Sequence, residues 1–385
     1  MNKEAKIIIA SAIAIIALGV ILIGFSKVKS PAKNEAVKSE KTSPIKIGFI
    51  GPLTGDTTNI GQNAKAAVQL AVNEVNSAGG INGRPLEVIY EDGQCAGKAA
   101  SNAANKLLNV DKVPVILGGA CSGETLSFAP AAEQAKTVVL SYCSSASAIT
   151  QAGDYIFRDY PSDLYQGKFV ADYFLNKLGK KRAAVLYMKT DWGTGIKNVF
   201  ADYFKNNGGE IVADEGYDQT SRDLRTQLTK IKAAKPDIVY FLAYEESAIP
   251  GIKQARELGL NIPIFGGDVW ESPKIWESVG GAGEGAMYSV VYTPLSDEFK
   301  AKMKAAVSNG EITLCSPEAY DGIKILAQAM AKAGTNSEDI KSELYKTSYT
   351  GGVSAEKIEF DQNGDLVGAN YVVKIIKDGK AEEVR

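Results

Sequence analysis

Short apolar runs alternate with longer segments of helical periodicity along most of the chain. From residue 45 onward the predicted strands are IKIGFIG, LEVIYED, VPVILGG and TVVLSY, and the predicted helices between them are GQNAKAAVQLAVNEVNSAGG, GKAASNAANKLLN and ETLSFAPAAEQAK. In the first of these helices apolar residues recur at helical spacing until Gly79-Gly80 ends the pattern. Because strands that lead into helices in this way form right-handed βαβ units, we expect a parallel sheet.

The alternation restarts in the second half of the chain. There the predicted strands are RAAVLYM, EIVADEGY, DIVYFLAY, IPIFGG and AMYSVV, and helices are expected to begin near Gly193, Asp223, Glu245 and Ser272. The pattern therefore predicts an α/β protein with two doubly wound lobes. Ligands of such sheets bind beyond the carboxyl ends of the strands, so the expected site is a cleft between the lobes.

The first 44 residues follow a different pattern. Residues 1–6 are mostly polar, and residues 7–25, IIIASAIAIIALGVILIGF, form an uncharged run. As a helix this run would span roughly 28 Å, close to the bilayer core of about 30 Å. A cleaved signal peptide is the alternative, but its apolar region is usually shorter and ends in a small-residue cleavage site that is missing here. We therefore expect an uncleaved membrane anchor at 7–25, a flexible tether at 26–44 and an extracytoplasmic location for the remainder.

The composition argues against catalysis. The 385 residues carry a formal net charge of −2 and include no histidine. A nucleophilic cysteine or serine usually needs a histidine base, and histidine-ligated zinc is excluded as well. The near-neutral charge gives no reason to expect nucleic acid as a partner. FDQNGDL at 360–366 lacks the spacing of a calcium loop, and we interpret it as a turn at Asn363-Gly364 between the strands KIEF and YVVKI. We expect a protein that is not an enzyme and that uses neither a cofactor nor a metal.

The cysteines allow two interpretations. Cys121 lies in GGACSGETL, which has the form of a nucleophile elbow, so a catalytic thiol at Cys121 or Cys143 is one hypothesis. Cys95 and Cys121 both follow strands at the carboxyl edge of one sheet, and we favour a disulfide between them. Such a bridge would stabilise the fold by roughly 2–4 kcal/mol and requires an oxidising compartment. Cys143 and Cys315 would form a second bridge, with free buried thiols as the alternative.

Several stretches resemble those of one protein family. IGFIGPLTGD, NSAGGINGRPLEV, GGACSGETLSFAP, the DWG turn and FDQNGDLVG are similar to sequences in the extracellular solute-binding proteins of ABC importers, of the branched-chain amino acid type. The resemblance runs from Ile45 to about Ile376. It implies the periplasmic-binding-protein type I fold, in which two lobes joined by three crossings close on a ligand.

The resemblance also implies where the lobes divide. The crossings are expected near Tyr160–Asp163, Val290–Thr293 and Thr347–Gly351. The amino-terminal lobe would then comprise residues 45–161 and 293–347, and the carboxyl-terminal lobe residues 162–292 and 348–385.

By resemblance, the amino-terminal lobe binds the α-carboxylate of an amino acid. Ser122 matches the serine that grips the carboxylate, with capping of the helix that begins here as its structural alternative. Cys143, Ser144 and Ser145 match a second clamp. There Ser145 would supply a hydroxyl and an N–H to the carboxylate, and the Cys143 carbonyl would accept a hydrogen bond from the ammonium.

By resemblance, the carboxyl-terminal lobe closes over the amine. Asp268 matches a carboxylate that pairs with the ammonium, whereas Tyr244 and Trp192 match aromatic residues of the pocket. Ile60 and Cys315 fall at positions that line the side-chain pocket. Each of Asp268, Tyr244 and Trp192 also has a structural alternative, Asp268 as a turn residue and the two aromatic residues as packing residues. Weaker candidates at the pocket edge are Asp163, Gln166 and Trp270.

Three departures from the family pattern concern the ligand. Asp268 stands where the branched-chain binder has a glutamate, Ile60 where an aromatic residue is often found, and Cys143-Ser144 where small apolar residues are common. A branched aliphatic amino acid is the first expectation, and a polar amino acid, an amide or another small carboxylate is the alternative. The implied partners are this ligand and the transmembrane subunits of an ABC permease, with the chain as a monomer. A sensor that reports ligand state to another membrane protein is the alternative function.

Overall fold

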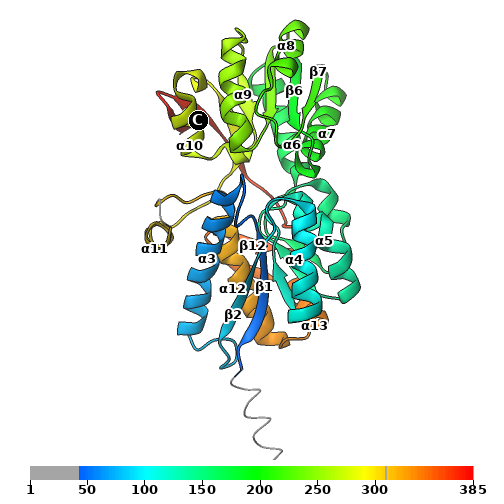
Figure 1. The fold of residues 1–385 in the computed structure, drawn as a ribbon, viewed down its shortest axis with the longest axis vertical. Coiled ribbons are helices and arrows are strands. Elements are labelled where there is room, and N and C mark those ends of the chain that lie inside the picture. The colour runs from blue at the N-terminus through cyan, green and yellow to red at the C-terminus, as the bar shows by residue number, and fades with distance from the viewer. Residues whose placement is uncertain (1–42, 308–309, 385) are drawn as a thin grey trace, which may run out of the picture. The chain divides into compact units, whose positions relative to one another are not determined.

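The computed structural model describes residues 43–307 and 310–384. Within the compact unit Pro44–Arg385 the chain forms two α/β lobes (Figure 1). The predicted anchor at 7–25 and nearly all of the tether lie outside the described residues. Among the residues that are described, none of the helices combines the length and the apolar character needed to cross a bilayer.

The first lobe is built on a five-stranded parallel sheet of order β2-β1-β3-β4-β5. Its strands are β1 (Ile45–Gly51), β2 (Leu86–Asp92), β3 (Val115–Leu117), β4 (Val138–Ser141) and β5 (Ile156–Arg158). Strands β3 and β4 are apolar at almost every position because helices cover both faces of a parallel sheet. The apolar pattern of the sequence predicts β1 to β4 but does not reveal β5, which is only three residues long.

Two helical layers enclose the first sheet. Helices α3 (Thr58–Ser77), α12 (Ser316–Ala333) and α13 (Ser337–Leu344) pack on one face, and α4 (Gly97–Lys106) and α5 (Ser122–Ala135) pack on the other (Figure 1). Helix α11 (Asp297–Ala306) also belongs to the first lobe, because Phe299 and Met303 join its core. The chain thus returns to the first lobe after building most of the second.

The second lobe contains a seven-stranded sheet of order β14-β13-β10-β9-β8-β6-β7. Its strands are β6 (Arg182–Met188), β7 (Glu210–Tyr217), β8 (Ile238–Leu242), β9 (Ile264–Gly266), β10 (Met287–Val291), β13 (Tyr371–Lys377) and β14 (Lys380–Glu383). Strands β6 to β10 run parallel, and β13 pairs antiparallel with both β10 and β14. The flanking helices are α6 (Asp163–Asp172), α7 (Asp191–Asn206), α8 (Arg225–Ala234), α9 (Glu245–Glu257) and α10 (Pro273–Val279).

Single-turn helical segments complete the description. They are η1 (Leu107–Asp111), η2 (Ser147–Gln151), η3 (Tyr173–Lys177), η4 (Asp268–Trp270) and η5 (Gly280–Gly283). Segment η4 follows β9 directly and therefore positions Asp268 at the carboxyl edge of the second sheet.

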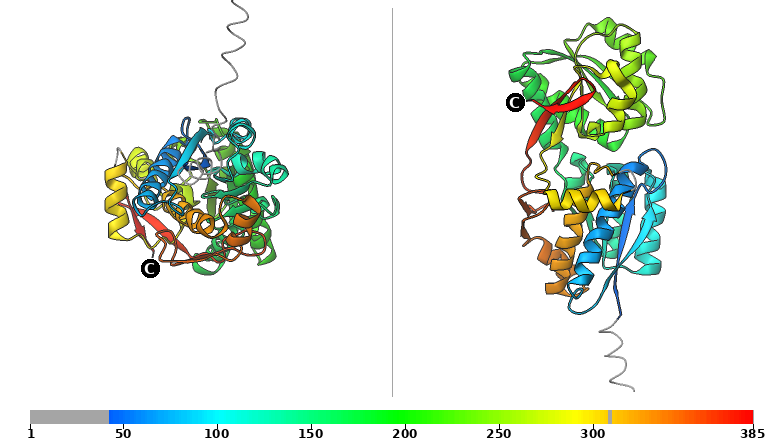
Figure 2. Two further views of the ribbon diagram at one scale, coloured as in Figure 1. Left: turned by 90° about the horizontal axis from the view of Figure 1, so that it is seen from below. Right: turned by 90° about the vertical axis from the view of Figure 1, so that its left-hand side faces the viewer.

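The third crossing lies later in the chain than predicted near Thr347–Gly351. Strand β11 (Ser348–Thr350) pairs with β12 (Lys357–Glu359), and Ile358, Phe360 and Leu366 are buried in the core of the first lobe. The chain therefore crosses between Leu366 and β13, along the segment that Figure 2 shows running from the first lobe to the second. Residues 348–366 belong to the first lobe because their apolar side chains complete its core.

The segment FDQNGDL keeps its turn but loses the predicted hairpin. Phe360 and Leu366 form an isolated antiparallel bridge, and Gly364 has a φ of 76°. The flanking strands do not pair with each other, since β12 pairs with β11 and β13 pairs with β10.

Candidate functional site

A cavity lies between the loops at the facing carboxyl edges of the two sheets. It is bordered by turns that follow β1, β3 and β4 in the first lobe, and by turns that follow β6, β8 and β9 in the second. The predicted residues that line it are Ile60, Ser122, Cys143, Ser145, Trp192, Tyr244 and Asp268. Residues from both lobes thus meet at one small site, as expected for ligands of doubly wound sheets.

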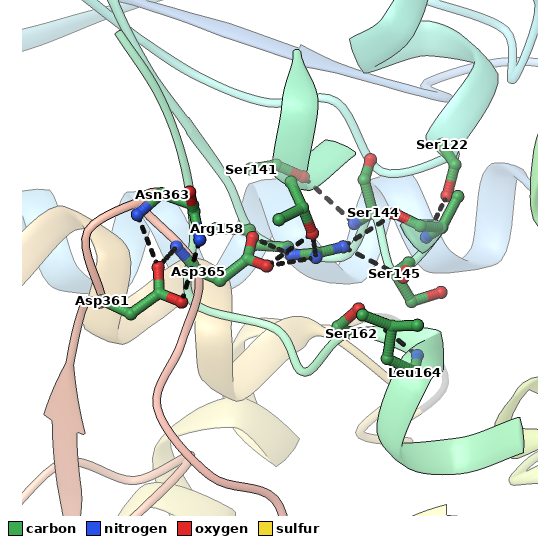
Figure 3. Close-up of polar contacts among 12 residues, drawn as sticks. Ser122, Ser141, Ser144, Ser145, Arg158, Ser162, Leu164, Asp361, Asn363 and Asp365 are labelled. Atoms are coloured by element: carbon green, nitrogen blue, oxygen red, sulfur yellow. Dashed lines mark hydrogen bonds and ion pairs between the residues drawn. The ribbon is translucent and has the colours of Figure 1, made fainter. Parts of the chain in front are cut away.

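The turn after β3 carries Ser122 at the first position of α5. The residue that caps this helix is Cys121, whose carbonyl accepts the N–H of Glu124 at 2.9 Å. The Ser122 hydroxyl instead accepts the N–H of Ala146 at 3.1 Å (Figure 3). The alternative that Ser122 caps α5 is therefore wrong. Its side chain instead connects the turn after β3 to the turn after β4.

Glu124, which was not among the predicted site residues, stabilises this turn through hydrogen bonds to its backbone. Its buried carboxylate accepts N–H groups from Cys95 and Ala120 at 2.9 Å and from Cys121 at 3.0 Å. Burial raises the pKa of Glu124 to about 7, despite these three amides. The sequence feature that could have identified Glu124 is the capping-box pattern at the start of α5, in which Glu124 is the third helical residue after the capping residue Cys121.

All four cysteines form disulfides. Cys95 pairs with Cys121 and Cys143 pairs with Cys315, with Cα–Cα distances of 5.3 and 5.4 Å. Both predicted bridges are confirmed, and the catalytic-thiol hypothesis for Cys121 or Cys143 is wrong because neither sulfur is a free thiol. The second bridge ties the turn after β4 to the start of α12.

In the turn after β4, the side chains of Ser144 and Ser145 point in different directions. Ser145 lines the cavity and is only 3% exposed. Ser144 is turned into the lobe, where its hydroxyl donates to the Gly119 carbonyl at 3.1 Å and lies 2.8 Å from the Thr125 hydroxyl. The prediction that Ser144 contacts the ligand is therefore corrected: its side chain braces the two turns against each other.

Arg158 fixes the position of Ser145 and was also missed. This fully buried side chain donates from Nη1 to the carbonyls of Ser145 at 3.0 Å and Ala146 at 2.8 Å. Its Nε and Nη2 donate to the two carboxylate oxygens of Asp365, each at 2.7 Å. Figure 3 shows this chain of contacts from Asp365 in the FDQNGDL turn through Arg158 to Ser145. Arg158 is a positioning residue, and it was overlooked because β5 was not recognised.

Asp268 provides the carboxylate of the second lobe. It is 3% exposed, and its Oδ2 accepts the Tyr160 hydroxyl at 2.7 Å while its Oδ1 accepts the N–H of Val269 at 2.9 Å. Burial raises the pKa of Asp268 above its ordinary value, although these two hydrogen bonds stabilise the charge. A cation bound in the cavity would stabilise the ionised form further.

The weaker candidates lie behind the cavity wall. Asp163 is fully buried at the start of α6, and its backbone N–H donates to the Ser145 carbonyl at 2.7 Å. Gln166 donates to the Ser289 hydroxyl at 3.0 Å. Trp270 is part of the second core, where its indole N–H donates to the Ala243 carbonyl at 3.2 Å.

Two aromatic rings form one wall of the cavity. Trp192, in the first turn of α7, and Tyr244, immediately before α9, stack with ring centroids 5.2 Å apart and an interplanar angle of 15°. Leu314 also lines the cavity, and the predicted Cys315 does not. Cys315 is corrected to a structural role, because its sulfur is bonded to Cys143 and the residue is absent from the cavity lining.

The arrangement is complementary to a small zwitterion. The first lobe presents two serines and the amino end of α5, which favour a carboxylate. The second lobe presents a buried carboxylate and stacked aromatic rings, which favour an ammonium and an apolar surface.

Comparisons with known proteins agree with this architecture. A family model described as periplasmic binding protein matches residues 44–380. An amino acid binding protein of Pseudomonas aeruginosa is 29% identical over 338 residues, which cover 86% of this chain and 89% of the relative. The leucine-, isoleucine-, valine-, threonine- and alanine-binding protein of the same organism is 28% identical, with coverage of 89% and 92%.

Solved structures show the same similarity. A leucine-binding protein of Thermotoga maritima has a TM-score of 0.82 at 28% identity, with 89% of this chain and 98% of that chain covered. The substrate-binding protein of a branched-chain amino acid transporter from Streptococcus pneumoniae, in complex with isoleucine, has a TM-score of 0.79 at 29% identity, with coverage of 89% and 99%.

Proposed function

This chain belongs to the periplasmic binding protein family, and on that premise we propose that it captures a small amino acid as the extracytoplasmic substrate-binding component of an ABC importer. A branched-chain aliphatic amino acid is the first ligand of this proposal. The similar proteins named for leucine, isoleucine and valine support that choice. Capture involves no covalent chemistry, so the chain acts as a binding protein rather than an enzyme.

The proposal is supported by the presence of Asp268, Ser122 and Ser145 in the lining of one cavity. These three side chains line one cavity but come from different lobes. The α-carboxylate of the ligand binds first at the serines and the amino end of α5, and the ammonium then pairs with Asp268 as the lobes close. Closure is a hinge motion about the three crossings, and ligand binding selects the closed state.

The location and the partners are part of the proposal. Two disulfides are suited to an oxidising space outside the cytoplasm. The apolar run 7–25 would anchor the chain to the membrane, with 26–44 as the tether that lets the binding unit reach the permease subunits. We propose a monomer without cofactor, metal or nucleic-acid partner.

A thermal-shift screen tests the proposed function. The protein is unfolded and refolded to remove carried ligand, and each free amino acid is then added. A ligand at a hundred times its dissociation constant stabilises the fold by about 2.7 kcal/mol, which is easily visible as a rise in Tm. We expect leucine, isoleucine or valine to raise the Tm, and Ser122→Ala to reduce that rise because the carboxylate loses a hydrogen bond.

The matched control is Ser342→Ala, on the exposed side of α13. It should leave the ligand-induced shift unchanged. If no α-amino acid stabilises the wild-type protein, the proposal is wrong.

A further inference from the structure

The binding cavity continues into a second compartment beyond the side-chain pocket. Thr57, Ile60, Tyr244, Val269 and Leu314 line both spaces, so the two are contiguous. Each has a volume of about 30 Å³. Because one water-sized probe occupies about 10–15 Å³, each compartment admits a few atoms of a narrow chain rather than an aromatic ring.

The second compartment is lined by acidic residues, and most of them are already paired. Glu245 accepts hydrogen bonds from Lys274 and from the Ser272 hydroxyl. Glu271 pairs with Lys374 at 2.6 Å and accepts the Tyr288 hydroxyl at 2.7 Å. Asp56 forms an ion pair with Arg222 of the other lobe. The charges of these three carboxylates are therefore compensated by the protein.

Glu246 is the fourth carboxylate, and its Oε2 is buried without a hydrogen-bond partner among the described residues. Burial and then the charges of Glu245 and Asp56 raise its pKa above the ordinary value. Acidic residues are favoured at the amino end of α9 because the helix dipole is positive there. This effect does not give the buried Oε2 of Glu246 a hydrogen-bond donor. A buried acceptor without a donor costs free energy that a ligand donor would recover.

Thr57 supplies a second unsatisfied atom on the opposite lobe. It precedes α3 as its capping residue, yet its hydroxyl caps no N–H. The residue is only 5% exposed, and its Oγ1 has no hydrogen-bond partner among the described residues. Thr57 and Glu246 thus place one hydroxyl and one carboxylate oxygen around the same compartment, one from each lobe.

We infer that this compartment receives the end of the ligand's side chain, and that the protein binds α-amino acids whose aliphatic stem ends in a cationic amine. Ile60, Val269 and Leu314 contact the methylene groups of the stem. The amine donates hydrogen bonds to Glu246 and Thr57. The inference rests on the proposed function, because the α-carboxylate and α-ammonium must occupy the first compartment for the side chain to point into the second.

Isothermal titration of the full chain with lysine, norleucine and leucine tests the inference. Norleucine has the stem of lysine without the amine, so the ratio of the two Kd values isolates the contribution of the amine. We expect lysine to bind at least about tenfold more tightly than norleucine, as a charge-assisted hydrogen bond in a buried site would produce. In Glu246→Gln this ratio should fall to within about threefold, and in Thr57→Val it should fall by a smaller factor.

Leucine serves as the internal reference, and Glu257→Gln, on an exposed face of the same helix, serves as the control variant. Glu257→Gln should leave both the Kd for leucine and the ratio of the lysine and norleucine Kd values within about threefold of the wild type. If leucine binds but lysine binds no better than norleucine, or if Glu246→Gln leaves their ratio unchanged, the inference is wrong while the proposed function stands. If none of the three binds, the inference is wrong, and the thermal-shift screen over the other amino acids decides the proposed function.

Discussion

At the scale of single residues, the site depends on carboxylates that the protein buries at a cost. Asp268 accepts hydrogen bonds from the Tyr160 hydroxyl and the Val269 amide, yet its burial still raises its pKa. A carboxylate in such a dry environment gains strongly from a cation, because little water screens the pair. In the proposed complex, Asp268 is therefore the group whose charge contributes most directly to ammonium binding.

Replacing Asp268 by asparagine removes that charge while keeping the shape of the side chain. We expect the Kd for the ligand to rise by about ten- to a hundredfold, since a charge-assisted hydrogen bond contributes roughly 1.5–3 kcal/mol. Titration calorimetry at pH 7 measures the change. Asp268→Glu should retain more of the affinity than Asp268→Asn, and the exposed variant Asp202→Asn should behave as wild type. Equal affinity for wild type and Asp268→Asn would show that the ammonium lies elsewhere.

At the scale of structural elements, the turn after β4 is held in place by three parts of the chain. Arg158 on β5 donates to its carbonyls, Asp365 in the FDQNGDL turn orients Arg158, and the Cys143–Cys315 disulfide ties the turn to α12. The turn is thus braced by elements that are far apart in the sequence. This explains how a short loop can present Ser145 in a fixed position.

Asp365→Asn breaks that brace by leaving the buried Arg158 guanidinium without its carboxylate. Removing one partner of a buried ion pair typically costs about 3–5 kcal/mol, and we expect the free energy of unfolding to fall by about this amount. Urea denaturation measures the loss, and ligand affinity should weaken as well because Ser145 is less firmly held. Glu210→Gln, in the exposed pair with Arg182, is the matched control and should cost less than about 1 kcal/mol. A similar small loss for both variants would contradict the bracing role of Asp365.

At the scale of the whole binding unit, buried acids make stability depend on pH. Burial raises the pKa of Glu318 to about 8, of Glu124 to about 7 and of Asp321 to about 6. Each folded-state pKa lies above the ordinary value near 4, so the fold favours the protonated acids. Their contribution to stability is fully present below about pH 4 and is lost as the pH rises through 6 to 8.

We therefore expect the Tm of the ligand-free protein to fall as the pH is raised from 6 to 8. Glu74 has the opposite effect on the pH dependence of stability. Hydrogen bonds from Lys302 and Lys324 outweigh its burial and lower its pKa to about 2. Its contribution is lost only below about pH 4, outside this window. Differential scanning calorimetry at several pH values measures the slope, and Glu318→Gln should flatten it. A Tm that is constant or rises across this range would contradict the expectation.

Some features could be predicted because they depend on local patterns. Apolar periodicity predicted four strands of the first sheet and the helices that begin near Gly193 and Glu245, since strand and helix place side chains at different intervals. The positions of Cys95 and Cys121 after strands of one sheet were enough to favour their bridge. Resemblance to a family then indicated Ser122, Ser145 and Asp268, all of which line the cavity.

The remaining features required the tertiary structure, because they join residues with no pattern between them in the sequence. Arg158 and Asp365 are 207 positions apart, and their pairing follows from the need to satisfy a buried charge. Ser144 was assigned to the ligand because sequence cannot show which way a side chain turns within a polar loop. The third crossing was placed too early because only packing reveals which core receives Ile358 and Leu366. By itself the sequence determined most of the strands and helices, the two-lobed plan and the polar groups at the strand ends. The tertiary structure decided which of those groups meet at one cavity, because long-range packing and the pairing of buried charges set that choice.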